Sequence, residues 1–246
     1  MPDLPEWPAP PRPAELTYTR LVKAILDRTF PANGSLPAER QLAERLGVTR
    51  STLREALQRL AAEGWIDIQQ GKPTRVKDVW TEGNLNVLAA LVSRQSALPP
   101  TFVPQLLEVR EALAPAYTAA AVRHNAGEVA AMIGRLLADL NDSPDSFASA
   151  DWTLHHQLTV LSTNPVYTLI LNGFVGFYQR MARRYFSLPE SRASSRQFYL
   201  DLRAAAASED PDAARAITAA VMCHSIDLWN RVSKGEGSLS PAPGIR

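Results

Sequence analysis

The chain has 246 residues, 46% hydrophobic and 21% charged, a globular composition long enough for two domains with separate cores. Its longest nearly uncharged run, residues 79–92, is too short and too polar to cross a bilayer, and the N-terminus lacks the pattern of a signal peptide. A single cysteine, Cys223, excludes an intramolecular disulfide framework and indicates a reducing environment. We therefore expect a cytoplasmic protein that does not associate with membranes.

The N-terminal region reads as a proline-rich arm followed by a helix. Residues 1–14 contain six prolines and few apolar anchors, which predicts disorder. From residue 15 to about residue 29, Tyr18, Leu21, Val22 and Ile25 recur at helical spacing. A turn over residues 31–34 then leads into the most informative stretch of the chain.

Residues 37–64 read as a helix, a short turn and a second helix. Ala38, Leu42 and Leu46 give the first helix one apolar stripe. Gly47 stands where a C-terminal cap belongs and Thr49 where the N-cap of the next helix belongs. The turn of about three residues is typical of a helix-turn-helix. The buried face of the second helix is expected to consist of Leu53, Ala56, Leu57 and Leu60.

A second, polar face of the same helix predicts contact with DNA. Arg50, Ser51, Arg54 and Gln58 cluster about a third of a turn from the leucines. Two arginines and hydroxyls on a short helix suit insertion into a major groove. The alternative is an ordinary amphipathic hairpin with solvated arginines. Net charge does not decide between them, because residues 1–78 hold 12 Lys and Arg against 10 Asp and Glu.

A β-hairpin is expected after residue 64, where the periodicity changes from helix to strand. Trp65, Ile66 and Ile68 precede a tight turn at residues 69–73, and a second short strand follows at residues 74–76. Placed after three helices, this hairpin is the wing of a winged helix. Gln70, Gly71 and Lys72 at its tip combine a small residue for close approach with a cation for phosphate, although Gly71 also suits turn geometry alone.

The rest of the chain predicts an all-α bundle. We expect a disordered arm at 1–14, a winged-helix domain at 15–78, a linker at 79–100, a helical effector domain at 101–234 and a flexible tail at 235–246. Prolines 165, 189 and 211 stand at expected helix starts. The expected helices span roughly 102–124, 127–141, 145–163, 165–186, 190–207 and 210–233. The fold class is therefore mostly α, with an N-terminal winged helix-turn-helix and a C-terminal helical bundle.

Two sets of residues resemble a known family of regulators. Residues 37–40 and 46–57 resemble the winged-helix domain of the GntR family of bacterial transcription regulators. Gly64-Trp65, Gln69, residues 71–74, and residues 164–167 and 169–173 are similar to its FadR branch, which responds to acyl-CoA. So are Tyr178, Arg180, Arg183, residues 185–186 and residues 189–192. The resemblance extends over about residues 16–234.

The resemblance implies a homodimer that binds a palindromic double-stranded operator in fatty acid genes, as repressor or activator, without a cofactor. Long-chain acyl-CoA would bind the helical domain and release the DNA. The wing carries Gln70 where the family has a histidine, which changes the groups offered to the groove. By matched position, the residues implied to touch DNA are Arg40, Thr49, Arg50, Ser51, Thr52, Arg54 and Gly71, and Gln70 joins them at the wing tip.

The ligand residues implied by the same resemblance lie in the helical domain. They are Leu106, Arg110, Tyr178, Tyr185, Ser225 and Trp229, with arginine suited to CoA phosphate and the others to an acyl tunnel. On the residues alone, aromatics at helical spacing indicate core packing more often than a ligand site. The chain departs from the family near Ser225, where Met222 and His224 replace a glycine and a glutamate. A methionine there is expected to reshape the pocket, because glycine permits close ligand approach.

A metal site is the alternative for the signal. Asp151 and His155 lie at i and i+4, a spacing that places both on one helix face. Many GntR relatives complete such a pair with two later histidines to hold a metal and an organic acid. Here those positions fall near Tyr199 and Val221, so the set is incomplete. The competing expectation is a plain hydrogen bond between Asp151 and His155.

Enzymatic activity is not expected. The sequence has no Gly-x-Ser-x-Gly elbow, no His-Glu-x-x-His and no phosphate-cradling glycine loop. An adaptor that uses a winged helix to bind protein is also disfavoured. Arg50 and Arg54 occupy the exposed face, where a protein-binding surface would favour apolar or aromatic residues.

Overall fold

The computed structural model describes residues 12–93 and 101–235, which form two compact units that divide between residues 97 and 98. Each unit is described by itself. Most of the proline-rich arm and of the expected tail lie outside the described residues. Among the described residues, no helix is both long and apolar enough to span a bilayer.

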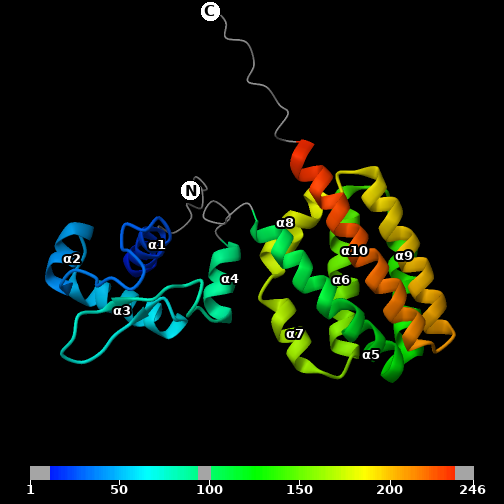
Figure 1. The fold of residues 1–246 in the computed structure, drawn as a ribbon, viewed down its shortest axis with the longest axis horizontal. Helices are drawn as coiled ribbons and strands as arrows, with labels where there is room; N and C mark the ends of the chain where they lie inside the picture. Colours follow the sequence, from blue (N-terminus) through cyan, green and yellow to red (C-terminus); the bar gives the residue numbers. More distant parts are fainter. Residues whose placement is uncertain (1–11, 94–100, 236–246) are drawn as a thin grey trace, which may run out of the picture. The chain divides into compact units, whose positions relative to one another are not determined.

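Unit 1 is a winged helix (Figure 1). Its elements are α1 (Pro13–Leu26), α2 (Glu39–Leu46), α3 (Arg50–Glu63), β1 (Ile66–Asp67), β2 (Arg75–Val76) and α4 (Leu85–Ser93). The two strands pair antiparallel, with Ile66 opposite Val76. The chain just before α2 adds a bridge between Ser35 and Arg75, so the wing is anchored to the helical part of the unit. Helix α4 lies within the stretch expected to be a linker.

The core of unit 1 is built from the apolar faces of α1 and α3 and from the strand residues. Leu21, Val22, Leu53, Leu60 and Trp65 are fully buried. The expected stripe of α2 needs one correction. Ala38 is the exposed N-cap residue of α2, and Ala43 is the buried alanine that packs beside Leu42. Ala38 precedes the first helical residue, Glu39, so it does not belong to the buried face of the helix.

Both predicted helix caps of the helix-turn-helix are confirmed. Gly47 ends α2 with φ +66°, a left-handed conformation that glycine adopts without steric cost. Thr49 begins α3, and its side chain accepts a hydrogen bond from the Thr52 backbone N–H at 3.2 Å. The two caps fix a turn of three residues between the helices.

Helix α3 is tied to α1 by an interhelical cluster at its C-terminal half. The Arg59 guanidinium lies 3.8 Å from the centre of the Tyr18 ring, and its nitrogens donate to Glu15 at 2.5 Å and to Glu63 at 2.9 Å. Glu63 also accepts from the Tyr18 hydroxyl and, at 3.2 Å, from the Trp65 indole N–H. Arg59 therefore serves packing within unit 1.

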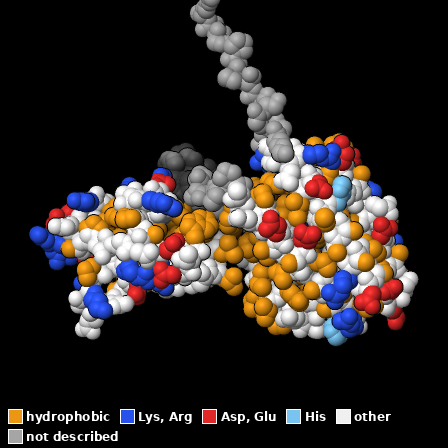
Figure 2. Space-filling view, viewed as in Figure 1, with side chains coloured by type: hydrophobic (Ala, Val, Ile, Leu, Met, Phe, Trp, Pro, Cys, Tyr) orange, Lys and Arg blue, Asp and Glu red, His pale blue; other side chains and the backbone are white. Residues whose placement is uncertain are grey.

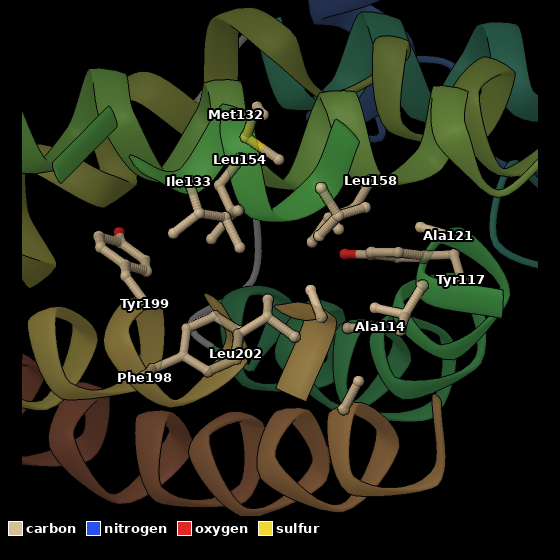
Figure 3. Close-up of a cluster of buried hydrophobic side chains, with 14 of the residues drawn as sticks. Ala114, Tyr117, Ala121, Met132, Ile133, Leu154, Leu158, Phe198, Tyr199 and Leu202 are labelled. Atoms are coloured by element: carbon tan, nitrogen blue, oxygen red, sulfur yellow. The ribbon is translucent and has the colours of Figure 1, made fainter. Parts of the chain in front are cut away.

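Unit 2 is all-α. Its helices are α5 (Phe102–Asp139), α6 (Pro144–Leu161), α7 (Pro165–Asn172), α8 (Val175–Tyr185), α9 (Pro189–Ala207) and α10 (Pro211–Gly235). Helix α10 packs against α5 and α9, and α6 packs against α5 and α8 (Figure 1). The core joins α5, α6 and α9 through side chains such as Ile133, Leu154, Leu158 and Leu202 (Figure 3).

Two helix boundaries differ from the sequence expectation. The break expected near residue 125 is a kink inside α5, where Asn125 leaves helical geometry at φ −146° and ψ 42° and donates to the Leu161 carbonyl at 2.7 Å. The single helix expected over residues 165–186 is two helices, α7 and α8, which meet at Gly173 and Phe174. This second break turns the apolar residues of α7 and α8 toward a common space.

Candidate nucleic-acid interface and ligand cavity

The first turn of α3 presents a polar, exposed surface in unit 1. Arg50 and Ser51 are exposed, and Thr52 is half-buried. The Thr49 hydroxyl lies 2.9 Å from the hydroxyls of both Ser51 and Thr52, so the three side chains are held together at the N-terminus of the helix. A helix N-terminus with exposed hydroxyls and an arginine suits contact with phosphates and base edges.

A second arginine of α3 is engaged by α2. The Arg54 Nε donates to Glu39 at 2.7 Å, and both side chains remain substantially exposed. An exposed pair of this kind is weak, so a DNA phosphate can displace the carboxylate. Arg40 follows Glu39 on α2 and is exposed. Figure 2 shows basic side chains at the α2 end and near the wing of unit 1.

The tip of the wing is open and its base is fixed. Gln70 and Gly71 are exposed, and Gly71 has φ +75°, a turn conformation that side chains disfavour. At the base, Arg75 donates to Glu82 through two bonds of 2.9 and 2.7 Å. Hydrogen bonding to Arg75 lowers the pKa of Glu82 to about 2, so this carboxylate stays charged. The wing therefore extends from a rigid base.

Unit 2 contains a cavity of about 120 Å³ between α5, α6, α7, α8 and α10. Most of its lining is apolar, including Leu107, Leu113, Ile170, Phe174 and Phe177. The break between α7 and α8 supplies Phe174, which the sequence analysis did not single out. The cavity brings together all six residues implied by the family resemblance, which are Leu106, Arg110, Tyr178, Tyr185, Ser225 and Trp229.

The polar part of the lining belongs to a buried network that we call the Asp151 cluster. Asp151 Oδ2 accepts from Arg110 Nη2 at 3.0 Å and from the Tyr178 hydroxyl, and Asp151 Oδ1 accepts from the Tyr199 hydroxyl at 2.9 Å. The cluster consists of Arg110, Tyr117, Asp151, His155, Tyr178 and Tyr199. Arg110, Tyr117, Asp151 and Tyr178 line the cavity.

His155 completes the network as a neutral side chain. Arg110 Nη2 lies 2.7 Å from His155 Nε2, and because a guanidinium only donates, Nε2 is the acceptor. His155 Nδ1 then donates to the Tyr117 hydroxyl at 2.8 Å. Burial, reinforced by the Arg110 charge and opposed by Asp151, lowers the pKa of His155 to about 3. The imidazole is therefore uncharged near neutral pH.

Asp151 is the carboxylate that compensates Arg110. Burial alone would raise the pKa of Asp151, but Arg110, His155 and the hydroxyls of Tyr178 and Tyr199 outweigh that effect and lower it. Burial raises the pKa of Tyr178 well above its ordinary value, so the phenol stays protonated as a donor. The cluster therefore contains one cation and one anion. This pairing argues against the expected use of Arg110 for CoA phosphate, because the guanidinium already holds a carboxylate.

The predicted hydrogen bond between Asp151 and His155 is wrong. Asp151 Oδ1 and His155 Nε2 are 3.7 Å apart, and their polar atoms are bound by Arg110 and tyrosines instead. Within the part of the chain that the structure describes, no three His, Cys, Asp or Glu side chains converge to hold a metal. The Arg110 guanidinium is within hydrogen-bond distance of both Asp151 and His155. Tyr199 stands near the position at which other GntR relatives supply a metal-binding histidine.

The expected effect of Met222 on the cavity is not what the structure shows. Met222 is buried in the hydrophobic core of unit 2, and the cavity lining does not include it. His224 is exposed. Ser225 lines the cavity, but its hydroxyl donates to the Met222 carbonyl at 2.6 Å. Ser225 is therefore tied to its own helix.

Sequence reasoning missed Tyr117 as a cavity residue and assigned Tyr199 no role beyond a vacant ligand position. A signal for Tyr117 was present, because Leu106, Arg110, Leu113 and Tyr117 follow one another at steps of three and four on α5. No comparable signal marks Tyr199, which reaches Asp151 from α9, 48 residues further along the chain.

Comparison with known proteins identifies both units. The model of bacterial regulatory proteins of the gntR family matches residues 13–76, and the FadR C-terminal domain matches residues 77–235. The fatty acid metabolism regulator protein of Shewanella amazonensis is 43% identical over 190 residues, covering 77% of this chain and 79% of that protein. The protein of the same name from Shewanella denitrificans is 39% identical over 220 residues, covering 89% and 92%.

A solved structure agrees with the fold. The Listeria monocytogenes protein Lar, described as controlling the expression of the agr system, superposes with a TM-score of 0.54 at 19% identity, covering 89% of this chain and 96% of that one. The gntR family consists of DNA-binding transcription regulators, not enzymes, that act in the bacterial cytoplasm. The chain belongs to the gntR family of bacterial regulatory proteins, within the group that carries a FadR C-terminal domain.

Proposed function

We propose that this protein regulates fatty acid metabolism genes as a homodimer on a palindromic operator and leaves that operator when long-chain acyl-CoA binds unit 2. The observation that carries the proposal is the cavity. It is apolar along most of its lining, ends in a buried polar cluster, and lies in the domain shared with the fatty acid regulators. An amphiphile with a long apolar chain and one polar group matches that lining.

The proposed DNA contacts are the exposed residues of the helix-turn-helix and the wing. In this proposal α3 enters the major groove with Arg50, Ser51 and Thr52 in its first turn, and Gln70 and Gly71 approach the adjacent backbone. Arg40, Thr49 and Arg54 complete the contacting set. A homodimer would place two copies of α3 on the two half-sites, and a ligand-induced change in their separation would weaken binding.

A gel shift tests this function directly. The full chain is titrated onto a palindromic operator from a fatty acid gene, with and without micromolar oleoyl-CoA. We expect a specific complex that oleoyl-CoA dissociates, while CoA alone leaves it intact. Operator binding that is unchanged across the oleoyl-CoA titration would refute the effector assignment. By reciprocity, excess operator must weaken oleoyl-CoA binding by the same factor.

A further inference from the structure

We propose that Arg75 and Glu82 position the wing for DNA binding, because their ion pair fixes strand β2 of the wing to the turn before α4. The inference rests on the DNA-binding part of the proposed function and concerns two residues outside the proposed contact set. Both act on DNA through residues 68–74, which we call the wing tip. They are therefore positioning residues, and neither needs to touch the operator itself.

The strands of the wing are too short to fix the wing tip by themselves. Strands β1 and β2 have two residues each, and an isolated two-stranded hairpin is marginally stable in water. The chain before α2 adds two backbone bonds of 2.8 Å, from the Leu36 N–H to the Thr74 carbonyl and from the Val76 N–H to the Gly34 carbonyl. These bonds hold the wing at its base, so the direction of the wing tip depends on side chains.

Arg75 ties three segments of unit 1 together at that base. Its Nη1 donates to Oδ1 of Asn33, in the turn before α2, at 2.9 Å. Nη1 and Nη2 also donate to the two carboxylate oxygens of Glu82, at 2.9 and 2.7 Å. A bidentate pair of arginine and carboxylate fixes direction as well as distance. Arg75 therefore links the chain before α2, strand β2 and the turn before α4.

Glu82 is held in place from its own side of the pair. Its Oε1 accepts from the Asp78 backbone N–H at 3.2 Å, and its backbone N–H donates to the Asp78 carbonyl at 2.7 Å. Two residues later, the Asn84 side chain accepts from the Val87 N–H at 3.2 Å and so caps α4. A Cβ atom at Gly64, which ends α3, would lie 2.9 Å from the Asn84 amide nitrogen. The segment that carries Glu82 is therefore packed closely against the end of α3.

A row of side-chain contacts leads from this base to the wing tip. Asp67 lies opposite Arg75 in the strand pair, and their opposite charges attract each other. Asp67 Oδ2 accepts from Gln69 Nε2 at 2.8 Å, and Gln69 Oε1 accepts from Lys72 Nζ at 2.9 Å. The Lys72 ammonium is thus held by a neutral amide and keeps its charge for a DNA phosphate. Loss of the pair between Arg75 and Glu82 would loosen the direction of Lys72.

The first test uses an effect that is opposite in sign to simple charge repulsion. Removing a carboxylate from a DNA-binding domain ordinarily strengthens binding, because carboxylates repel phosphates. Glu82→Ala removes one, yet we expect operator binding to weaken about five-fold, since a phosphate contact of the wing tip is lost. Fluorescence anisotropy of the full chain on the operator measures it. Glu44→Ala, at an exposed carboxylate of α2, is the matched control and should bind as tightly as wild type or more tightly. Unchanged or tighter binding by Glu82→Ala would overturn the proposal.

A double-mutant cycle with Lys72→Ala tests whether Glu82 acts through the wing tip. Loss of one phosphate contact should reduce the slope of log affinity against log salt by about 0.9. We expect Glu82→Ala and Lys72→Ala to reduce this slope equally, and the double variant to bind as well as Lys72→Ala alone. Losses that add in the double variant would refute the assignment, because Glu82 would then act independently of Lys72.

Arg75→Lys covers the case in which Glu82→Ala does not fold. Lysine keeps the positive charge but cannot form the bidentate pair with Glu82. We expect this variant also to lose operator affinity about five-fold, with the same reduction in salt slope. Wild-type affinity in Arg75→Lys would show that charge alone suffices and would reject the positioning role. Failure of the proposed function is recognised separately: oleoyl-CoA would then not release the operator from the wild-type protein, whatever the wing variants do.

Discussion

The two units carry their functional charges in opposite ways. In unit 1 the arginines proposed to meet DNA are exposed on α2 and α3, and Glu39, which pairs with Arg54, is itself open to solvent. In unit 2 the arginine of the cavity is half-buried and is held between the buried side chains of Asp151 and His155. The difference teaches that substituting one of these exposed arginines of unit 1 should change DNA binding without changing stability. In unit 2 binding and stability are coupled through the same atoms.

Removing the buried carboxylate is the strongest way to test that coupling. Asp151→Ala leaves the Arg110 charge unpaired inside unit 2, and we expect a loss of about 3–5 kcal/mol in the free energy of unfolding of that unit. Urea unfolding measures it. Asp142→Ala, which removes an exposed partner, should cost below about 1 kcal/mol. Equal losses in the two variants would show that burial of the pair does not matter.

A substitution on the recognition surface should give the opposite pattern. Arg50→Ala is expected to weaken operator binding by about 1–3 kcal/mol and to relax base preference, with the melting temperature unchanged. Fluorescence anisotropy on operator and scrambled duplexes measures both effects. Arg215→Ala, at an exposed arginine of α10, is the control. Full operator affinity in Arg50→Ala would remove α3 from the proposed interface.

Acid should destabilise unit 2 before it affects unit 1. The folded pKa of His155, about 3, lies below the unfolded value near 6.5. Stability from the neutral imidazole is therefore complete above pH 6.5 and is lost as the pH falls toward 3, by about 2 kcal/mol at pH 5. Unfolding from pH 7 to pH 4.5 measures the slope. His155→Gln should flatten it and His224→Gln should not; an equal slope in His155→Gln would exclude this histidine as the source.

The smallest expected effect concerns the cap of α3. Thr49→Ala removes the hydrogen bond to the Thr52 N–H and should cost about 1 kcal/mol in the stability of unit 1. Thr49→Ser keeps a hydroxyl and should retain most of it. Chemical denaturation of unit 1 distinguishes the two variants. If they are equally stable, the cap does not hold the first turn.

The same contrast explains what could be predicted from the sequence. Gly47 and Thr49 were identified because a cap is a local property of a few residues, and their expected conformations are confirmed. The fold class followed from periodicity for the same reason. The α7–α8 break at Gly173 was missed because both flanking segments are apolar at helical spacing. Only their packing around a shared cavity separates them.

The cavity required the whole fold of unit 2. The residues that line it lie between positions 103 and 229 on several helices, so no short stretch of the sequence contains the cavity. The family resemblance implied six of its residues, but it did not imply that Arg110 pairs with Asp151. The ion pair with Asp151 joins positions 41 residues apart, and no spacing rule relates residues on two different helices. The burial of this pair and the balance of its charges depend on the three-dimensional positions of the side chains.

The cluster around Arg59 has a mechanical consequence for signalling. The guanidinium is stacked on the Tyr18 ring, and Glu63 is bound at once by α1, α3 and the start of the wing through Tyr18, Arg59 and Trp65. Rotating α3 within unit 1 would break several of these bonds together. An effector that alters DNA affinity has a less costly route, which is to displace unit 1 as a rigid body. In the proposed homodimer, the effector would then change the distance between the two copies of unit 1 and leave the structure of each copy unchanged.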